Sequence, residues 1–310
     1  MSQPGALLDP IHASQELSRL VSAQTLVRLH EPLAKRTTLR VGGPADLYVE
    51  PACDADLSAV LQFSAEHQMP LFVLGRGSNL LIKDGGFRGL VICLAQPAFC
   101  RIEVQGEQLN CGAGARLKAV AMEAKRCGIG GLEFLEGIPG SVGGALRMNA
   151  GAMGGAMFDV VDSVQVMDMA GRAHQLALVD IAVAYRCCTT LKTQIALRAV
   201  LQGKPQPREK IEQLMNEFSR RRWDSQPAAS SAGCIFKNPP TVPAGKLIDE
   251  LGLKGARVGG AMVSLEHGNF LINDGTATAR DVLELIEVVR ARARSERGID
   301  LQTEVEIIGE

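Results

Sequence analysis

Residues 130–155 read GGLEFLEGIPGSVGGALRMNAGAMGG, and nine of these twenty-six residues are glycine. The remaining residues are too apolar and too varied for a flexible linker, so the stretch is expected to pack. Glycine lets backbone N–H groups approach a ligand closely, and Ile138 and Pro139 add a rigid apolar surface. This combination suits a flat cofactor that carries charge. A buried turn rich in small residues is the alternative.

A second glycine-rich stretch lies upstream, where residues 74–81 read LGRGSNLL. It separates two apolar runs, so a strand, a turn and a second strand are expected. A Rossmann fingerprint needs a third glycine and a following helix, and this stretch offers neither. Backbone amides of the turn, with the side chains of Ser78 and Asn79, can still surround a pyrophosphate.

Length and charge exclude several classes of protein. The chain has 310 residues, enough for two or three domains. Its 33 basic and 34 acidic residues nearly balance and form no long basic run, so neither nucleic acid nor a membrane surface is expected as a partner. No secretory signal and no membrane-spanning apolar window is visible. A soluble cytoplasmic protein is expected.

Cysteine and histidine usage argues against metal chemistry. Eight cysteines are scattered without a C-x-x-C pair, and the five histidines are isolated. Neither a metal site, nor a disulfide framework, nor histidyl attachment of a flavin is expected. Most of the cysteines are expected to be buried thiols that act as small apolar side chains.

Hydrophobic periodicity predicts helices and strands without regular βαβ alternation, which indicates an α+β fold. The residues before about 16 are expected to be irregular, and residues 203–207 are the clearest candidate domain boundary. Helices are expected over residues 16–28, 54–68, 116–127, 208–222, 244–251 and 279–297, the last with Thr278 and Asp281 as a capping pair. Strands are expected over residues 39–50, 71–74, 80–82, 90–94, 160–169, 172–178, 194–202, 270–272 and 305–308, around Val263, and as a hairpin over 101–111.

Five motifs together resemble one known family. They are LGRGSNLL at 74–81, GIPGSVGGA at 137–145 with MNAG at 148–151, YR at 185–186, SAGCIFKNP at 231–239, and residues 301–309. In this order they are similar to the UDP-N-acetylenolpyruvoylglucosamine reductases of bacterial peptidoglycan synthesis. The match extends from about residue 33 to the C-terminus, and five motifs in order make chance agreement very improbable.

The resemblance implies an α+β protein with an FAD-binding fold of the vanillyl-alcohol oxidase (PCMH) type, followed by a smaller α+β substrate-binding domain. On this basis we expect an N-terminal extension with a short helix over residues 1–32, an FAD-binding domain over 33–204 and a substrate-binding domain over 205–310. The FAD-binding domain is expected to have two subdomains, at about 33–95 and 96–204.

In that family NADPH reduces FAD, hydride passes to the enolpyruvyl methylene of the UDP-sugar, and a protein acid protonates the neighbouring carbon. The product is UDP-N-acetylmuramate. The resemblance therefore implies FAD as a non-covalent cofactor, NADPH as hydride donor and a UDP-sugar as substrate. It also implies a cytoplasmic monomer that serves cell-wall biogenesis, cell shape and cell division.

Motif position implies which residues hold FAD. They are Gly75, Arg76, Gly77, Ser78, Asn79, Gly137, Ile138, Pro139, Gly140, Ser141, Gly144, Asn149, Ala150 and Gly151. By the same comparison, the substrate is expected to contact Tyr185, Arg222, Asn238, Lys254 and His267.

Three catalytic residues follow from the reaction and the motifs. Addition of hydride to the methylene carbon leaves charge on the carboxylate-bearing carbon, and a nearby cation and a carboxyl group stabilise the resulting enediolate. Motif position gives these roles to Arg186 and Glu304. The family usually has serine where this chain has Cys234. A thiol, with an ordinary pKa of about 8.5, is a stronger acid than a hydroxyl and stays mostly protonated at neutral pH. Cys234 is therefore expected to be the general acid.

Three further positions depart from the family pattern. Cys188 replaces a serine, Met153 replaces a frequent tyrosine, and Glu306 stands where arginine is common. The last change puts one contact to the substrate in doubt. Two other functions remain open from the sequence, namely another FAD-dependent oxidase or dehydrogenase of this fold and a flavin-binding module without catalysis.

Overall fold

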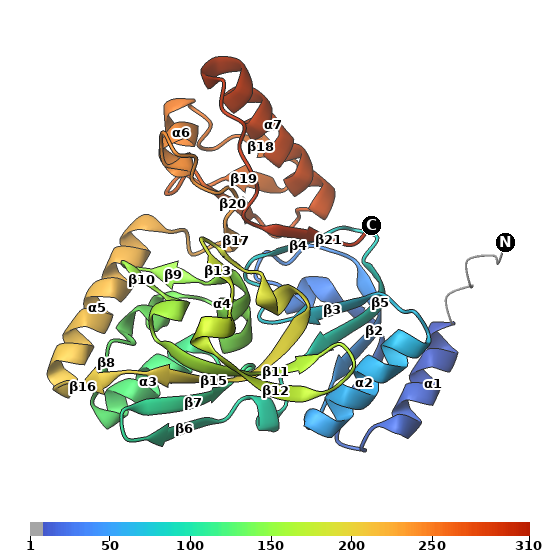
Figure 1. Ribbon diagram of the computed structural model, residues 1–310. Coiled ribbons are helices and arrows are strands. Elements are labelled where there is room, and N and C mark those ends of the chain that lie inside the picture. Colours follow the sequence, from blue (N-terminus) through green and yellow to red (C-terminus); the bar gives the residue numbers. More distant parts are fainter. Residues whose placement is uncertain (1–8) are drawn as a thin grey trace. The chain divides into compact units, whose positions relative to one another are not determined.

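The computed structural model describes residues 9–310 as two compact units (Figure 1). The first unit contains the described residues up to 31 together with residues 46–75 and 89–220. The second unit contains residues 32–45, 76–88 and 221–310. The chain thus makes two short excursions into the second unit before its C-terminal part completes that unit.

The first unit contains the greater number of elements. In chain order they are α1 (Pro10–Leu20), β1 (Leu26–Pro32), β2 (Pro44–Glu50), α2 (Asp54–Glu66), β3 (Leu71–Leu74), β5 (Phe87–Cys93), β6 (Ile102–Gln105), β7 (Gln108–Gly112), α3 (Leu117–Cys127), β8 (Ile129–Gly130), α4 (Val142–Met148), β9 (Gly151–Ala152), β10 (Gly155–Ala156), β11 (Val161–Asp168), β12 (Ala173–Ala177), β13 (Val183–Ala184), β14 (Cys187–Cys188), β15 (Gln194–Gln202), β16 (Lys204–Pro205) and the larger part of α5 (Arg208–Ser225).

Two larger sheets organise this unit. The four-stranded sheet has the order β1-β2-β5-β3, in which β3 and β5 are parallel. The five-stranded sheet has the order β12-β11-β15-β7-β6, and all its neighbouring strands are antiparallel. The short strands form the pairs β9/β10, β13/β14 and β8/β16. Residues 204–205, within the expected boundary, therefore pair with residues 129–130 inside the first unit.

One hydrophobic core fills the first unit and anchors the glycine-rich stretch. Leu57 on α2, Val120 on α3 and Leu197 on β15 are fully buried in it. Burial of an aliphatic side chain contributes about 1.5–3 kcal/mol relative to exposure. Val142 and Leu146 of α4 belong to the same core and are also fully buried. The stretch packs, as its composition predicts.

The predicted helices over residues 54–68, 116–127, 208–222, 244–251 and 279–297 are confirmed to within a few residues. Helix α3 ends at Cys127, because Gly128 adopts a left-handed φ of 70° and its N–H donates to a carbonyl of the last turn. The strands that were predicted after residue 70 are likewise confirmed, with small shifts at their ends.

The helix predicted over residues 16–28 is wrong. Helix α1 begins at Pro10, where Asp9 caps it by accepting from the His12 N–H, and it ends at Leu20. Residues 26–32 form strand β1 instead. The first strand, expected over 39–50, is limited to β2. The expectation of irregular structure before residue 16 fails for residues 10–15 and otherwise falls largely on residues 1–8, which lie outside the described residues.

The second unit contains β4 (Leu80–Ile82), β17 (Ser230–Cys234), α6 (Ala244–Glu250), β18 (Arg257–Val258), β19 (Ala261–Val263), β20 (Phe270–Asn273), α7 (Ala279–Arg297) and β21 (Glu306–Ile308). A sheet of order β17-β20-β19-β18 shares a hydrophobic core with α6 and α7. Strand β21 pairs in parallel with β4. Residues near the C-terminus are thereby fixed to the strand that follows residues 76–79.

The start of α7 matches the predicted capping pair. The Thr278 hydroxyl accepts from the Asp281 N–H at 3.1 Å, and the Asp281 carboxylate accepts from the Thr278 N–H at 2.9 Å. The Asp84 carboxylate also accepts from the N–H groups of Ala279 and Arg280, at 2.8 and 2.9 Å. These bonds join the turn after β4 to the same helix.

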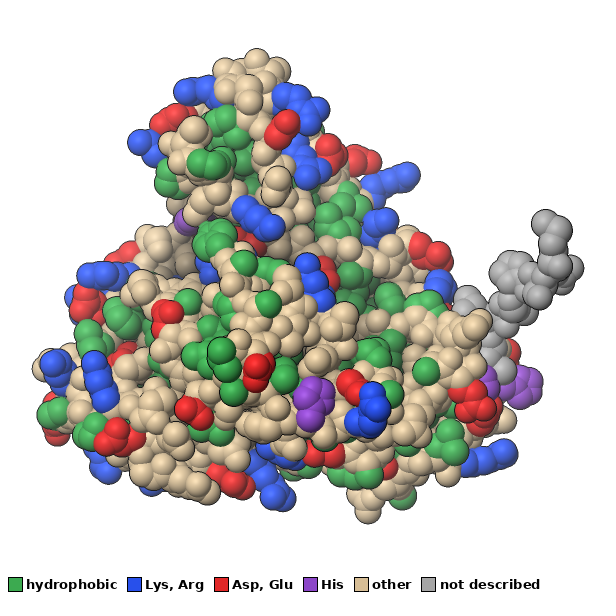
Figure 2. Space-filling model, viewed as in Figure 1, with side chains coloured by type: hydrophobic (Ala, Val, Ile, Leu, Met, Phe, Trp, Pro, Cys, Tyr) green, Lys and Arg blue, Asp and Glu red, His purple; other side chains and the backbone are tan. Residues whose placement is uncertain are grey.

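Surface charge is mixed. On the face that Figure 2 displays, Lys and Arg side chains are interspersed with Asp and Glu side chains, in keeping with the balanced composition. Within residues 9–310, no helix combines the length and the apolar character needed to cross a lipid bilayer.

Candidate active site

The glycine-rich stretch contributes a fixed turn to the first unit. The first turn of its helix α4 is hydrogen-bonded to the segment before α3. The Val142 N–H donates to the Ala115 carbonyl at 2.9 Å, and the Gly143 N–H donates to the Ala113 carbonyl at 2.7 Å. On the other side, the Gly140 carbonyl accepts from the Leu117 N–H at 3.2 Å. The backbone around residue 141 is therefore held in one position.

At two glycines of this stretch, neither protein packing nor a left-handed φ excludes a larger residue. A Cβ atom on Gly143 would lie 3.1 Å from the Ala113 Cβ, so packing explains that glycine. A Cβ atom on Gly137 would meet nothing within 4 Å, and one on Gly144 would meet only the Ser141 Oγ, at 3.6 Å. Neither Gly137 nor Gly144 has a left-handed φ. Open space beside bare backbone fits the close approach of a flat ligand, as an FAD site requires.

The upstream glycine stretch reaches the same place. Gly75 directly follows β3, and a Cβ atom on it would lie 3.1 Å from the Ser141 Oγ and 3.9 Å from the Gly144 Cα. The structure thus brings together three of the expected FAD-binding residues from two motifs about 66 residues apart in the sequence (from 75 to 141).

The residue pair Tyr185-Arg186 forms the turn of the β13/β14 hairpin. Arg186 has a left-handed φ of 55°, a conformation that costs a non-glycine residue about 1–2 kcal/mol. Its Nη1 donates to the Gly151 carbonyl at 3.3 Å, and its guanidinium carbon lies 5.4 Å from the centre of the Tyr185 ring. The Asn149 Nδ2 donates to the Ala184 carbonyl at 3.4 Å. Arg186 is therefore held against the end of the glycine-rich stretch.

The remaining expected FAD-binding residues, 76–79, lie in the second unit. Gly77 has a φ of 62°, and a Cβ atom on it would lie 2.4 Å from the Arg36 carbonyl oxygen, so no other residue fits there. The Thr38 hydroxyl donates to the Ser231 carbonyl at 2.6 Å and lies 3.3 Å from the Gly77 carbonyl. This turn is thereby joined to β17, the strand that ends in Cys234.

Asn79 joins the same turn to the segment that carries Glu304. Its Nδ2 donates to the Glu304 carbonyl at 3.1 Å, and its own carbonyl accepts from the Glu306 N–H at 3.0 Å. The side-chain amide that was expected to face a pyrophosphate therefore makes a hydrogen bond within the protein.

Cys234 and Glu304 lie on neighbouring backbone segments. The Glu304 N–H donates to the carbonyl of Ile235, the residue after Cys234, at 2.7 Å. Cys234 itself follows a bulge, because the pairing of β17 with β20 shifts between Ser231 and Cys234. Gly233 in the bulge has a φ of 76°, which favours glycine. The structure thus brings together two of the three expected catalytic residues, and Arg186 belongs to the other unit.

Four of the expected substrate-binding residues lie in the second unit, and each has a partner or a place that the structure defines. The Lys254 Nζ lies 2.9 Å from the Asp249 carboxylate. Burial, together with the positive charge of Lys254, lowers the pKa of His267, so the imidazole is neutral at neutral pH. Asn238 accepts from the Ala244 N–H at 2.9 Å and so caps α6. Arg222 lies in the last turn of α5, on a different element from these residues.

Comparison with known proteins identifies the family. A family model described as the C-terminal domain of UDP-N-acetylenolpyruvoylglucosamine reductase matches residues 226–308, and a model described as an FAD binding domain matches residues 45–177. The chain is 43% identical over 298 residues to "UDP-N-acetylenolpyruvoylglucosamine reductase 2" of Symbiobacterium thermophilum, covering 96% of each chain. The chain belongs to the UDP-N-acetylenolpyruvoylglucosamine reductase family.

Other reductases of this family match most of the chain. The reductase of Paramagnetospirillum magneticum is 46% identical over 279 residues, or 90% of each chain. The crystal structure of the reductase from Thermus caldophilus matches with a TM-score of 0.80 and 41% identity, covering 92% of this chain and 99% of that one. The α+β fold class, the FAD-binding fold and FAD as cofactor, all expected from the sequence, are confirmed.

The three departures from the family pattern have distinct places in this reductase-family chain. Cys188 is fully buried on β14, and burial raises the pKa of its thiol. Met153 lies in the β9/β10 turn with a φ of 53°. Glu306 begins β21 and pairs with Leu80. Cys188 therefore has the environment of a structural thiol.

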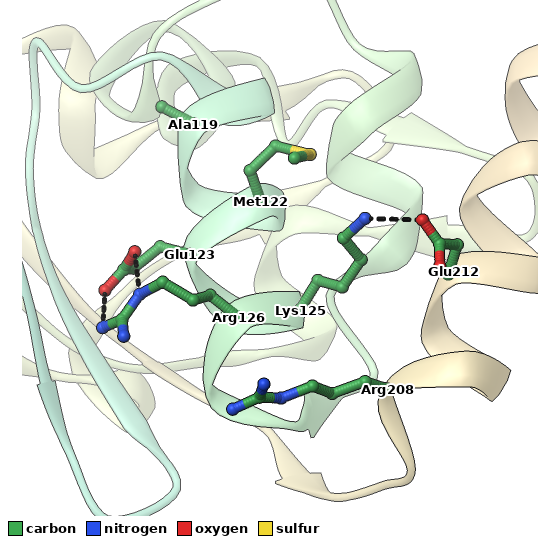
Figure 3. A pocket seen from close by; sticks show the side chains of 7 residues that line it. All are labelled: Ala119, Met122, Glu123, Lys125, Arg126, Arg208 and Glu212. Carbon is green, nitrogen blue, oxygen red and sulfur yellow. Dashed lines mark hydrogen bonds and ion pairs between the residues drawn. The ribbon is translucent and has the colours of Figure 1, made fainter.

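None of the expected site residues lines the surface groove of about 550 Å³ that lies between two helices. It is lined by Ala119, Met122, Glu123, Lys125 and Arg126 of α3 and by Arg208 and Glu212 of α5 (Figure 3). Lys125 pairs with Glu212 at 2.9 Å, and Arg126 pairs with Glu123 at 2.6 Å. The first ion pair joins α3 to α5 and the second lies within α3, and none of the expected site residues lines this groove.

Proposed function

We propose that this chain reduces UDP-N-acetylglucosamine enolpyruvate to UDP-N-acetylmuramate, with NADPH as hydride donor and FAD as bound cofactor. The observation that carries the proposal is 43% identity to a named reductase over 96% of both chains, combined with Cys234 and Glu304 on adjacent backbone segments. The reaction belongs to peptidoglycan precursor synthesis. We place it in the cytoplasm, on a monomer, with cell shape and division as the processes it serves.

The fourteen expected residues from Gly75 to Gly151 would hold FAD without a covalent bond. The bare backbone at Gly137 and Gly144 supports this assignment, because open space lies beside both residues. We assign flavin binding to residues 33–204 and substrate binding to residues 205–310. FAD, when bound, transfers hydride from NADPH to the methylene carbon of the enolpyruvyl group.

Arg186 and Glu304 would act on the charge that develops in the substrate. Once hydride has reached the methylene carbon, the neighbouring carbon carries electron density that spreads into its carboxylate. A fixed guanidinium stabilises such an anion more than it stabilises the substrate, because the charge grows during the step. The strained φ of Arg186 supports this role, since asparagine or glycine would adopt the turn more easily.

Cys234 would supply the proton. Its S–H bond breaks, a C–H bond forms on the carboxylate-bearing carbon, and the thiolate takes a new proton from solvent. The hydride and this proton together account for the two hydrogens that the reduction adds to the enolpyruvyl double bond. Gly233 supports the role because the bulge that it permits sets the direction of the next side chain.

The UDP part of the substrate would be bound by Asn238, Lys254, His267, Arg222 and Tyr185. Lys254 supplies positive charge for a diphosphate. His267, neutral and accepting the Asn269 N–H at its Nδ1, can offer its Nε2–H as a hydrogen-bond donor. Tyr185 is 61% exposed and so is open to a ligand.

The function is tested by following NADPH oxidation by the purified protein. We expect oxidation to depend on UDP-N-acetylglucosamine enolpyruvate, and mass spectrometry to find UDP-N-acetylmuramate in matching amount. UDP-N-acetylglucosamine, which lacks the enolpyruvyl group, is the control and should support no oxidation. Oxidation that needs only oxygen would instead indicate an oxidase, and a bound flavin without any turnover would indicate a module without catalysis.

A further inference from the structure

The backbone after Cys234 is held by an unusual partner, the buried side chain of Asn269. The Phe236 N–H donates to the Asn269 Oδ1 at 2.9 Å, and the Asn269 Nδ2 donates to the Phe236 carbonyl at 2.8 Å. The backbone carbonyl of Asn269 also accepts from the Ile235 N–H at 2.9 Å. Asn269 is only 3% exposed.

These bonds continue a sheet beyond its last strand residue. Strand β17 pairs with β20 up to Cys234 and Phe270. Past that pair, the chain before β20 turns through Gly268 and His267, so none of the strands described within residues 9–310 pairs with Phe236 on that side. The carboxamide of Asn269 presents one acceptor and one donor, as a peptide group in a neighbouring strand would.

The opposite edge of the same segment is held by the chain that carries Glu304. The Ile235 carbonyl accepts from the Glu304 N–H at 2.7 Å, and the Lys237 N–H donates to the Gln302 carbonyl at 2.9 Å. Residues 235–237 are thus fixed from both sides. A substitution of the Asn269 side chain removes its two bonds to Phe236 and leaves the backbone bond between Ile235 and Asn269, so residue 236 loses its partner on one side only and the segment that includes Cys234 can shift relative to Glu304.

We propose that Asn269 is a positioning residue for the reaction, which sets the placement of the Cys234 thiol relative to Glu304 through the backbone of residues 235–236. This inference rests on the proposed function, because placement of the thiol matters only where the thiol delivers a proton. Asn269 itself does not touch the substrate in this role. Asparagine is required because aspartate keeps the acceptor but replaces the donor with a second acceptor, opposite the Phe236 carbonyl.

The test compares Asn269→Asp with Asn273→Asp. Asn273 is the last residue of β20, which begins directly after Asn269; it is 7% exposed and bonds to the Leu39 carbonyl and to the N–H groups of Gly275 and Ala277. It is a matched control, because both variants place a carboxylate in a buried asparagine site. The flavin of each protein is reduced by NADPH without oxygen. The UDP-sugar is then added, and the rate at which the flavin absorbance returns is measured.

We expect Asn269→Asp to slow this return about ten- to hundredfold, as a small misplacement of a reacting group does, and to leave flavin content and bleaching by NADPH unchanged. Asn273→Asp should return at the wild-type rate. In a Cys234→Ala background, Asn269→Asp should cause no further slowing, because its effect passes through the thiol. Equal slowing with and without the thiol would overturn the proposal.

A second readout needs no substrate. The alkylation rate of Cys234 by iodoacetamide, followed by mass spectrometry of its peptide, should differ from wild type in Asn269→Asp and not in Asn273→Asp. If Cys234 is alkylated at the wild-type rate in both folded variants, Asn269 does not set the placement of its thiol and the proposal is overturned. If the wild-type protein ignores the UDP-sugar while alkylation still changes in Asn269→Asp, then the proposed function fails and the positional link between Asn269 and Cys234 stands.

Discussion

Gly144→Ala should stabilise the protein without cofactor and weaken its hold on FAD. Gly144 lies inside α4, where alanine is favoured over glycine by about 0.5–1 kcal/mol. The new methyl group would meet only the Ser141 Oγ, at the ordinary contact distance of 3.6 Å. The free energy of unfolding of the apoprotein should therefore rise by up to this amount. A ligand that lies against the bare backbone, in contrast, must shift away from the methyl group.

The expected loss of affinity follows from the cost of overpacking. An added methylene in a filled site costs about 1–3 kcal/mol, and tenfold in affinity corresponds to about 1.4 kcal/mol, so FAD should bind roughly five- to hundredfold more weakly. Titration of the apoprotein with FAD, followed by flavin fluorescence, gives the affinity, and urea unfolding of the same apoprotein gives the stability.

Gly143→Ala is the matched control for this experiment. Its methyl group would lie 3.1 Å from the Ala113 Cβ and 3.2 Å from the Ala113 carbonyl, so this variant should lose stability rather than gain it. Unchanged FAD affinity in Gly144→Ala would refute the inference that the open space beside this glycine belongs to the cofactor.

Three further predictions concern the second unit. Cys234→Ala should leave flavin reduction by NADPH intact and slow product formation about 10²–10⁴-fold, whereas Cys234→Ser should keep substantial activity; an alanine variant that turns over like wild type removes the general-acid role. Gly233→Ala and Gly298→Ala should each lose about 1–2 kcal/mol in urea unfolding, since both glycines have left-handed φ angles, of 76° and 65°. Only Gly233→Ala should also slow the sugar-dependent step, and equal turnover by both would contradict a role for the bulge. Lys254→Met should raise the pKa of His267, measured by NMR, because one of the two causes that lower it is removed. Since the pKa of His267 lies below the ordinary value of about 6.5, the native state loses stability as pH falls below that value, and the variant should lose less; an unmoved pKa would contradict the charge effect.

Helices whose ends are set by residues close in the sequence could be predicted from the sequence. Helix α3 ends at Cys127 because Gly128 can adopt a left-handed φ, and α7 begins with the hydrogen bonds between Thr278 and Asp281. The misplaced first helix shows the opposite case. Apolar spacing favoured continuation through Val27, but Ser22 and Thr25 turn the chain by donating to the buried carboxylate of Asp56, 34 and 31 residues away.

The candidate site shows the same division. The motifs indicated which residues to inspect, and Gly75, Ser141 and Gly144 do lie together. The motifs could not indicate that the amide of Asn79 bonds to the Glu304 carbonyl, 225 residues away, or that Asn269 holds Phe236. These contacts depend on which strands become neighbours, and a lone buried asparagine has no sequence signal of its own.

The most direct test of the proposed function is a single turnover without oxygen. Purified protein is bleached with one equivalent of NADPH, UDP-N-acetylglucosamine enolpyruvate is added, and the flavin absorbance is followed while the product is identified by mass spectrometry. We predict rapid recovery of the absorbance together with formation of UDP-N-acetylmuramate. A flavin that bleaches with NADPH and stays bleached in the presence of the UDP-sugar would contradict the proposed substrate.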